Sequence, residues 1–173
     1  MRNPEAILKK RLEKAERVAV LGMGSMLRGD DAAGLLAAEH LAKRCRGNKS
    51  RAAKVHVFMG ETAPENLTGE IRNFHPTHII LLDATDAGLK PGQFTVIDPD
   101  AVNSMDLAST HKLPINVFTA YLRGSIGCDV MVVGIQPASR KFGEPACEAV
   151  RKCAAQLADL LALALQRSKR RKA

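Results

Sequence analysis

Short apolar runs rich in valine and isoleucine alternate along this chain with longer amphipathic segments. This alternation constrains the fold most strongly, because it is typical of βαβ units that build a mostly parallel sheet covered on both faces. We therefore predict an α/β protein. The expected strands are 17–21, 54–59, 78–83, 93–97 and 129–135, and the expected helices are about 4–15, 31–44, 64–74, 114–124 and 144–166.

The link between the strands over 78–83 and 93–97 is too short for a crossover helix. Parallel neighbours need a connection of about a dozen residues or more. The strand over 93–97 is therefore expected to run antiparallel to its neighbours in a mixed sheet.

The 173 residues, 46% of them hydrophobic, suit one domain with one sizeable core. We expect a single domain over 1–173, with an extra N-terminal helix over 1–16 and a basic, disordered tail over 167–173. The chain has no run of 18 apolar residues, and its charged N-terminus has no apolar core behind it. These features favour a cytoplasmic protein.

The net charge of +8 lies at the two ends of the chain, because residues 18–166 carry fifteen basic and fifteen acidic side chains. With five Phe, one Tyr and no Trp, the chain also has few rings on which bases could stack. We therefore expect no nucleic-acid partner. The four cysteines form no C-x-x-C pair, which argues against a zinc knuckle or a redox motif.

A glycine-containing loop follows the first expected strand and leads to the pair Asp30-Asp31. Glycines at this place are typical of nucleotide sites. However, Leu27 stands where the third glycine of G-x-G-x-x-G belongs, and the two acids would repel a phosphate. We expect one of these acids to cap its own helix and the other to turn out over the sheet edge.

Asp83 ends the expected strand over 78–83, which should lie beside the first strand in a doubly wound sheet. Ligands bind such sheets at the carboxyl ends of the strands, so Asp31 and Asp83 should lie together there. His111, in a polar loop, could add a nitrogen ligand. Two carboxylates and an imidazole suit a borderline divalent metal such as nickel or zinc, although Asp83 could equally be a solvated strand-end acid.

Six sequence blocks, spread in order over about residues 17–165, together resemble the [NiFe]-hydrogenase maturation endopeptidase family, especially the branch that serves formate-hydrogenlyase-type hydrogenases. The blocks are 24–31 (GSMLRGDD), 63–66 (APEN), 83–92 (DATDAGLKPG), 97–100 (IDPD), 110–114 (THKLP) and 134–137 (GIQP). One departure is Ser25, where the family usually has asparagine.

The resemblance implies a three-layer α/β/α sandwich around a five-stranded mixed sheet in the order 2-1-3-5-4, with strand 4 antiparallel. It implies an enzyme that removes the C-terminal extension of a hydrogenase large-subunit precursor. We also expect the protein to be a monomer without membrane insertion. Nickel would arrive with the precursor, and no permanently bound cofactor is expected. The implied nickel contacts are Asp31, Asp83 and His111, and Asp31 and Asp83 are also the candidate catalytic residues.

Two alternatives remain open. A nucleotide-binding α/β protein could use Gly22 and Gly24 for phosphate and Glu61 for a ribose. A non-catalytic chaperone could dock on the immature large subunit. No Ser-His-Asp or Cys-His arrangement with known spacing is present, which disfavours covalent catalysis.

Overall fold

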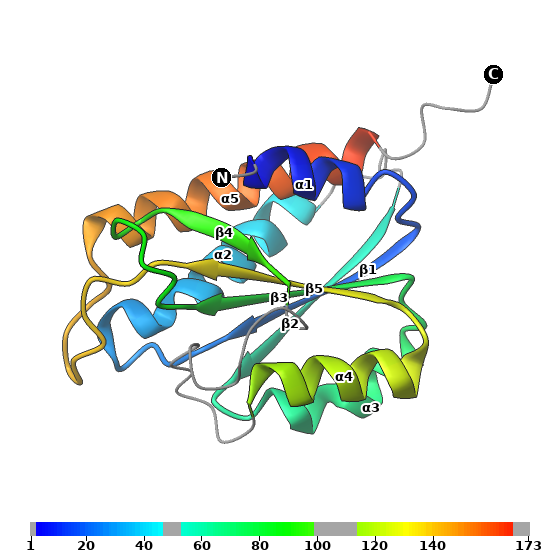
Figure 1. Cartoon of the computed structure of the whole chain (residues 1–173), viewed down its shortest axis with the longest axis horizontal. Helices are drawn as coiled ribbons and strands as arrows, with labels where there is room; N and C mark the ends of the chain where they lie inside the picture. The colour runs from blue at the N-terminus through cyan, green and yellow to red at the C-terminus, as the bar shows by residue number, and fades with distance from the viewer. Residues whose placement is uncertain (1–2, 47–52, 99–113, 168–173) are drawn as a thin grey trace.

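The computed structural model describes residues 3–46, 53–98 and 114–167 and forms a sheet covered by helices on both faces (Figure 1). The strands are β1 (Arg17–Met23), β2 (Lys54–Glu61), β3 (His78–Ala84), β4 (Phe94–Ile97) and β5 (Asp129–Ile135). The helices are α1 (Pro4–Arg11), α2 (Ala33–Cys45), α3 (Thr68–Asn73), α4 (Ile115–Ile126) and α5 (Glu148–Arg167), with short 3₁₀ turns η1 (Gly29–Ala32) and η2 (Pro64–Leu67).

The five strands follow the order β2-β1-β3-β5-β4. The β1–β2, β1–β3 and β3–β5 pairs are parallel, and β4 is antiparallel to β5. The predicted fold class, strand order and strand direction are therefore confirmed.

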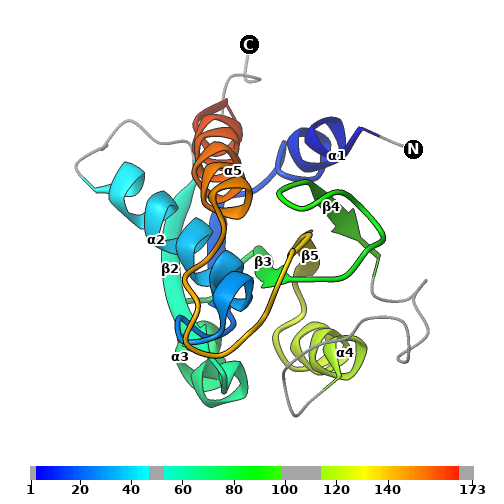
Figure 2. The ribbon, with the colours of Figure 1, turned by 90° about the vertical axis from the view of Figure 1, so that its left-hand side faces the viewer.

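The helices α1, α2 and α5 cover one face of the sheet, and α3 and α4 cover the other (Figure 2). Successive side chains of a strand point to opposite faces, so β3 contributes to both cores. Ile80 and Leu82 pack in the first core, whereas Ile79 and Leu81 pack in the second. This burial on both faces explains why the central strands are continuous apolar runs.

The bounds of several helices differ from the sequence prediction, and the helix expected over 64–74 is divided into η2 and α3. The first helix ends at Arg11 instead of about residue 15, with Leu12 as its C-cap. The last helix begins at Glu148 instead of about residue 144. Pro145 disfavours helical geometry at the residue before it, and the segment ahead of α5 is bound by a distant side chain described below.

The start of α2 lies unusually close to the ends of β1 and β3. A Cβ added at Gly34 would lie 2.1 Å from the Leu82 carbonyl oxygen and 2.5 Å from that of Met23. Only glycine permits this approach, which brings η1 over the carboxyl edge of the sheet. Among the described helices, none combines the length and the apolar character needed to cross a membrane.

Candidate functional site: buried carboxylates at the carboxyl edge of the sheet

Asp31 lies in η1, between β1 and α2, and only 1% of it is exposed to solvent. The turn that positions it depends on Gly24, which has a φ of 121°. A Cβ at Gly24 would also lie 1.8 Å from the Asp31 carbonyl oxygen. The glycine of this loop therefore makes room for the acid that follows it, as well as supplying a conformation that other residues rarely adopt.

Asp83 lies near the end of β3 and is 4% exposed. Its Oδ1 accepts a hydrogen bond of 2.9 Å from the N–H of Ala84. The neighbouring position on β5 is Gly134, which has no side chain to cover the acid from that strand. The space over Gly134 is instead filled by the side chains of Thr85 and Ile97, since a Cβ there would lie 2.7 Å from Thr85 and 2.8 Å from Ile97.

Arg140 connects the two elements that carry these acids. Its Nε lies 3.7 Å from Oδ1 of Asp31, and its Nη2 donates a hydrogen bond of 2.7 Å to the carbonyl of Ala84, the residue after Asp83. Asp31 and Asp83 thus lie at the same edge of the sheet, as predicted. The sequence analysis did not identify Arg140, because it lies in a loop with no recognisable motif.

Asp30 has a structural role that differs from the predicted one. Its carboxylate does not cap its own helix but accepts hydrogen bonds from the N–H groups of Ala138 (2.7 Å), Ser139 (3.1 Å) and Cys147 (2.6 Å). Burial raises the pKa of Asp30, but these bonds outweigh that effect and hold it below its ordinary value. Asp30 therefore fixes the loop that carries Arg140.

The loop after Asp83 is held by Gln136. The Gln136 Oε1 accepts bonds from the N–H groups of Ala87 (2.8 Å) and Leu89 (3.1 Å), and its Nε2 donates to Asp86 Oδ1 (3.1 Å). The hydrogen bond from Gln136 is the main reason that the pKa of Asp86 lies below its ordinary value. The Gln136 side chain thus holds this loop at three points, and further bonds from the Gly88 N–H to Asp86 and from the Lys90 N–H to Gln93 complete it.

His111 lies outside the described residues, so the structure says nothing about the third predicted ligand. Within the described ranges, no group of three or more His, Cys, Asp and Glu side chains could hold a metal ion. His56 stacks on Phe58, with ring centroids 4.3 Å apart, and His78 is part-buried beside Asp129.

Two observations bear on the alternative chemistries. The Gly24 N–H donates a 2.9 Å hydrogen bond to the carbonyl of Glu61, and the Asp30 N–H donates one of 2.8 Å to that of Ser139. These loop amides are thus used within the protein, which disfavours a phosphate site. Burial raises the pKa of the Cys128 and Cys153 thiols to about 11, so neither is a ready nucleophile.

The fold and site define an α/β/α sandwich with two buried acids and an arginine at its carboxyl edge, a place where such sheets bind ligands. Carboxylates there can bind a cation or accept a proton from water. The comparison with known proteins gives the family.

A family model described as the HycI hydrogenase maturation protease matches residues 37–167, a span that includes Asp83 and Arg140 and begins after Asp31. The hydrogenase 3 maturation protease of Escherichia coli K12 is 38% identical over 132 residues, covering 76% of this chain and 80% of that protein. The crystal structure of the [NiFe] hydrogenase maturation protease HycI from Thermococcus kodakarensis KOD1 has a TM-score of 0.82 and 30% identity, covering 92% of this chain and 98% of the other. The solution structure of the endopeptidase HycI from Escherichia coli has a TM-score of 0.72 and 35% identity, covering 84% and 89%.

This chain belongs to the hydrogenase maturation protease family, and it is a peptidase. The resemblance inferred from the six sequence blocks is confirmed.

Proposed function

We propose that this protein removes the C-terminal extension from a nickel-loaded [NiFe]-hydrogenase large-subunit precursor, acts as a monomer in the cytoplasm, and recognises the nickel through Asp31, Asp83 and His111. The observation that carries the proposal is the position of Asp31 and Asp83, two buried acids from separate elements at one sheet edge. Family membership supports the reaction class.

The donor set suits nickel that is already held by the precursor. Two carboxylates and one imidazole are acceptable ligands for a borderline divalent ion, and three ligands leave coordination positions for groups of the precursor. Ligands from the protease and from the precursor would then together complete the coordination of the nickel ion. A precursor without nickel would lack the ion that positions the precursor on the protease.

Within this proposal, the substrate's nickel orients the precursor and polarises the scissile carbonyl. Water is the nucleophile, and a carboxylate of the Asp31–Asp83 pair accepts its proton. Arg140 would keep Asp31 oriented until the precursor binds. Burial raises the pKa of Cys128 and Cys153 to about 11, so these two thiols are poor nucleophiles for the reaction.

The direct test is to incubate the protein with empty precursor and with nickel-loaded precursor, and to follow the precursor's mass. We expect loss of the extension from the loaded precursor alone. Equal cleavage of both would reject nickel recognition but keep the peptidase. A stable complex with an intact extension after long incubation would instead favour the chaperone alternative.

A further inference from the structure

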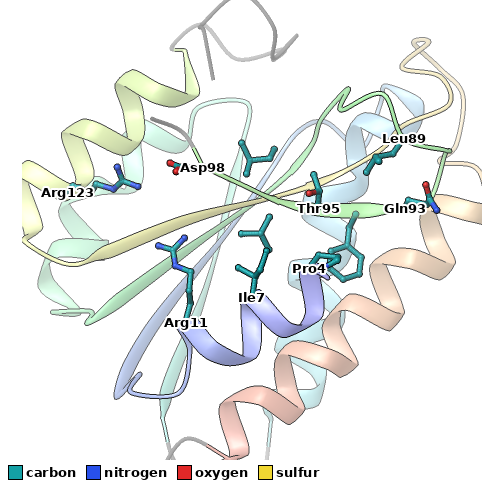
Figure 3. Close-up of a pocket in the computed structure, with 11 residues that line it drawn as sticks. Pro4, Ile7, Arg11, Leu89, Gln93, Thr95, Asp98 and Arg123 are labelled. Atoms are coloured by element: carbon teal, nitrogen blue, oxygen red, sulfur yellow. The ribbon is translucent and has the colours of Figure 1, made fainter. Parts of the chain in front are cut away.

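A groove of about 750 Å³ lies outside the edge of the sheet (Figure 3). Pro4, Ile7 and Arg11 of α1 form one wall, and Arg123 of α4 lies on the other side. Between them lie all four residues of β4 together with the flanking residues Gln93 and Asp98. The groove therefore follows β4 along its length.

Among the described strands, β4 pairs only with β5, so its outer edge faces this groove. Natural proteins usually protect such an edge with charged residues, proline or a bulge. The β4 sequence Phe94-Thr95-Val96-Ile97 has neither charge nor proline, and its register with β5 is regular. Although α1 packs beside this short strand, the groove between them leaves the β4 edge without a strand partner among the described residues. Such an edge can accept an extended peptide as an added strand.

One end of the groove is connected to the loop that follows Asp83. Leu89 lines the groove, and its N–H donates a hydrogen bond to the side chain of Gln136. The main-chain N–H of Gln136 in turn donates a hydrogen bond of 2.8 Å to the carbonyl of Gln93. Two strand spacings separate β3 from β4 and a third separates β4 from an added strand, so Asp83 lies roughly 15 Å from the groove, a gap that about five extended residues can span. A peptide cut near Asp83 can therefore continue into the groove.

We propose that this groove binds the C-terminal extension of the precursor as a strand added to β4. This inference rests on the proposed function. The extension is the part of the precursor that the mature subunit lacks, so it can adopt an extended conformation without unfolding that subunit. Binding would hold the segment on the C-terminal side of the scissile bond in a fixed position relative to Asp31 and Asp83.

The lining favours an extension segment with uncharged side chains. Ile7 and Val96 form apolar surface in the middle of the groove. Arg11 is already paired with Asp129, and Arg123 donates to the carbonyl of Val130 at 3.2 Å. Affinity would come from main-chain hydrogen bonds, and alternate side chains of the peptide would contact the apolar wall.

Hydrogen exchange followed by NMR tests the proposal in the wild-type protein, with a synthetic peptide of the extension as the probe. We expect slower exchange of alternate amides within β4 when the peptide is added. Unchanged β4 exchange at saturating peptide would overturn the proposal. Protection of these amides without peptide would also overturn the proposal in two cases. If it is lost on removing residues 168–173, the occupant is the chain's own tail. If it is lost on dilution, the occupant is a second copy of the chain.

A matched pair of variants extends the test to the whole precursor. Ile7→Trp fills the groove, whereas Leu163→Trp adds the same ring at a position of α5 that is 43% exposed. We expect Ile7→Trp to raise KM for nickel-loaded precursor about tenfold with little change in kcat, because it removes binding but no catalytic group. Leu163→Trp should match wild type, and an unchanged KM in folded Ile7→Trp would reject the groove.

The wild-type protein separates the two proposals. If it fails to cleave loaded precursor, the proposed function falls and the groove proposal falls with it. If it cleaves normally while the β4 amides stay unprotected, only the groove proposal falls.

Discussion

Nε of Arg140 lies 3.7 Å from Oδ1 of Asp31, while the same guanidinium donates a 2.7 Å hydrogen bond to the carbonyl of Ala84 at the end of β3. A cation thus occupies the space beside a buried acid that is proposed to bind a metal ion. The positive charge of Arg140 opposes the arrival of a second cation beside Asp31.

The variant Arg140→Met should bind free Ni²⁺ more tightly than the wild type. Removing the neighbouring charge removes repulsion worth about 1 kcal/mol, which corresponds to roughly fivefold in Kd. The variant should also unfold at lower temperature, because a hydrogen bond from a charged group contributes about 1.5–3 kcal/mol. Titration calorimetry and thermal unfolding measure the two effects.

Arg44→Met is the control for the Arg140 variant, because Arg44 forms an ion pair with Asp159 on the exposed side of α2 and α5. It should leave Ni²⁺ affinity unchanged. Weaker Ni²⁺ binding by Arg140→Met would mean that the arginine positions Asp31 for the metal instead of opposing it.

The variants Asp31→Asn, Asp83→Asn and His111→Ala should each reduce cleavage of nickel-loaded precursor by about a hundredfold or more, as expected for groups that act as a unit. The two acids are 1% and 4% exposed, so their side chains are part of the packing around them. Asparagine is therefore the better substitution, because alanine would leave a cavity.

Precursor processing and circular dichroism should be measured together for these variants. Asp159→Asn is the matched control, since this acid lies on α5 and pairs with Arg44. Full activity in folded His111→Ala would remove that residue from the proposed metal site.

Asp30→Asn should destabilise the protein and change its response to acid. The Asp30 pKa is below its ordinary value of 3.8 in the folded state. The unfolded state therefore binds the proton more readily, and the stabilisation is complete above 3.8 and is lost as the pH falls through the folded value. Urea unfolding from pH 7 to pH 3 should show a smaller loss of stability in the variant.

The cost of Asp30→Asn at pH 7 should be about 2–4 kcal/mol, because three hydrogen bonds to a buried carboxylate are weakened. An unchanged slope of stability against pH would show that other carboxyl groups account for acid sensitivity. The Asp86 pKa is also lowered, but its carboxylate is exposed and should contribute little.

The fold followed from the sequence because its signals are local. Continuous apolar runs predicted buried strands, and the short link before β4 predicted its direction. Local sequence signals could not show which of Asp30 and Asp31 has the structural role. The Asp30 carboxylate accepts hydrogen bonds from the N–H groups of Ala138 and Cys147, which lie more than a hundred residues away in the sequence. No local pattern predicts that contact.

Arg140 was missed for the same reason. Its partners are a 3₁₀ turn and a strand end that are distant in sequence, and an arginine in a polar loop is usually solvated. The edge groove was also not predicted, because it requires the position of α1 relative to β4.

The isolated protein should bind nickel weakly, with a Kd above about 10 μM, and nickel-loaded precursor much more tightly. Asp31, Asp83 and His111 come from separate segments, so binding must pay their ordering cost, and they lack the soft thiolates that hold nickel firmly. Arg140 adds a positive charge beside Asp31. Calorimetry with Ni²⁺ alone, then with empty and loaded precursor, measures each contribution. A submicromolar Kd for Ni²⁺ alone would contradict this, because the protease could then load itself and would no longer report whether the precursor contains the metal.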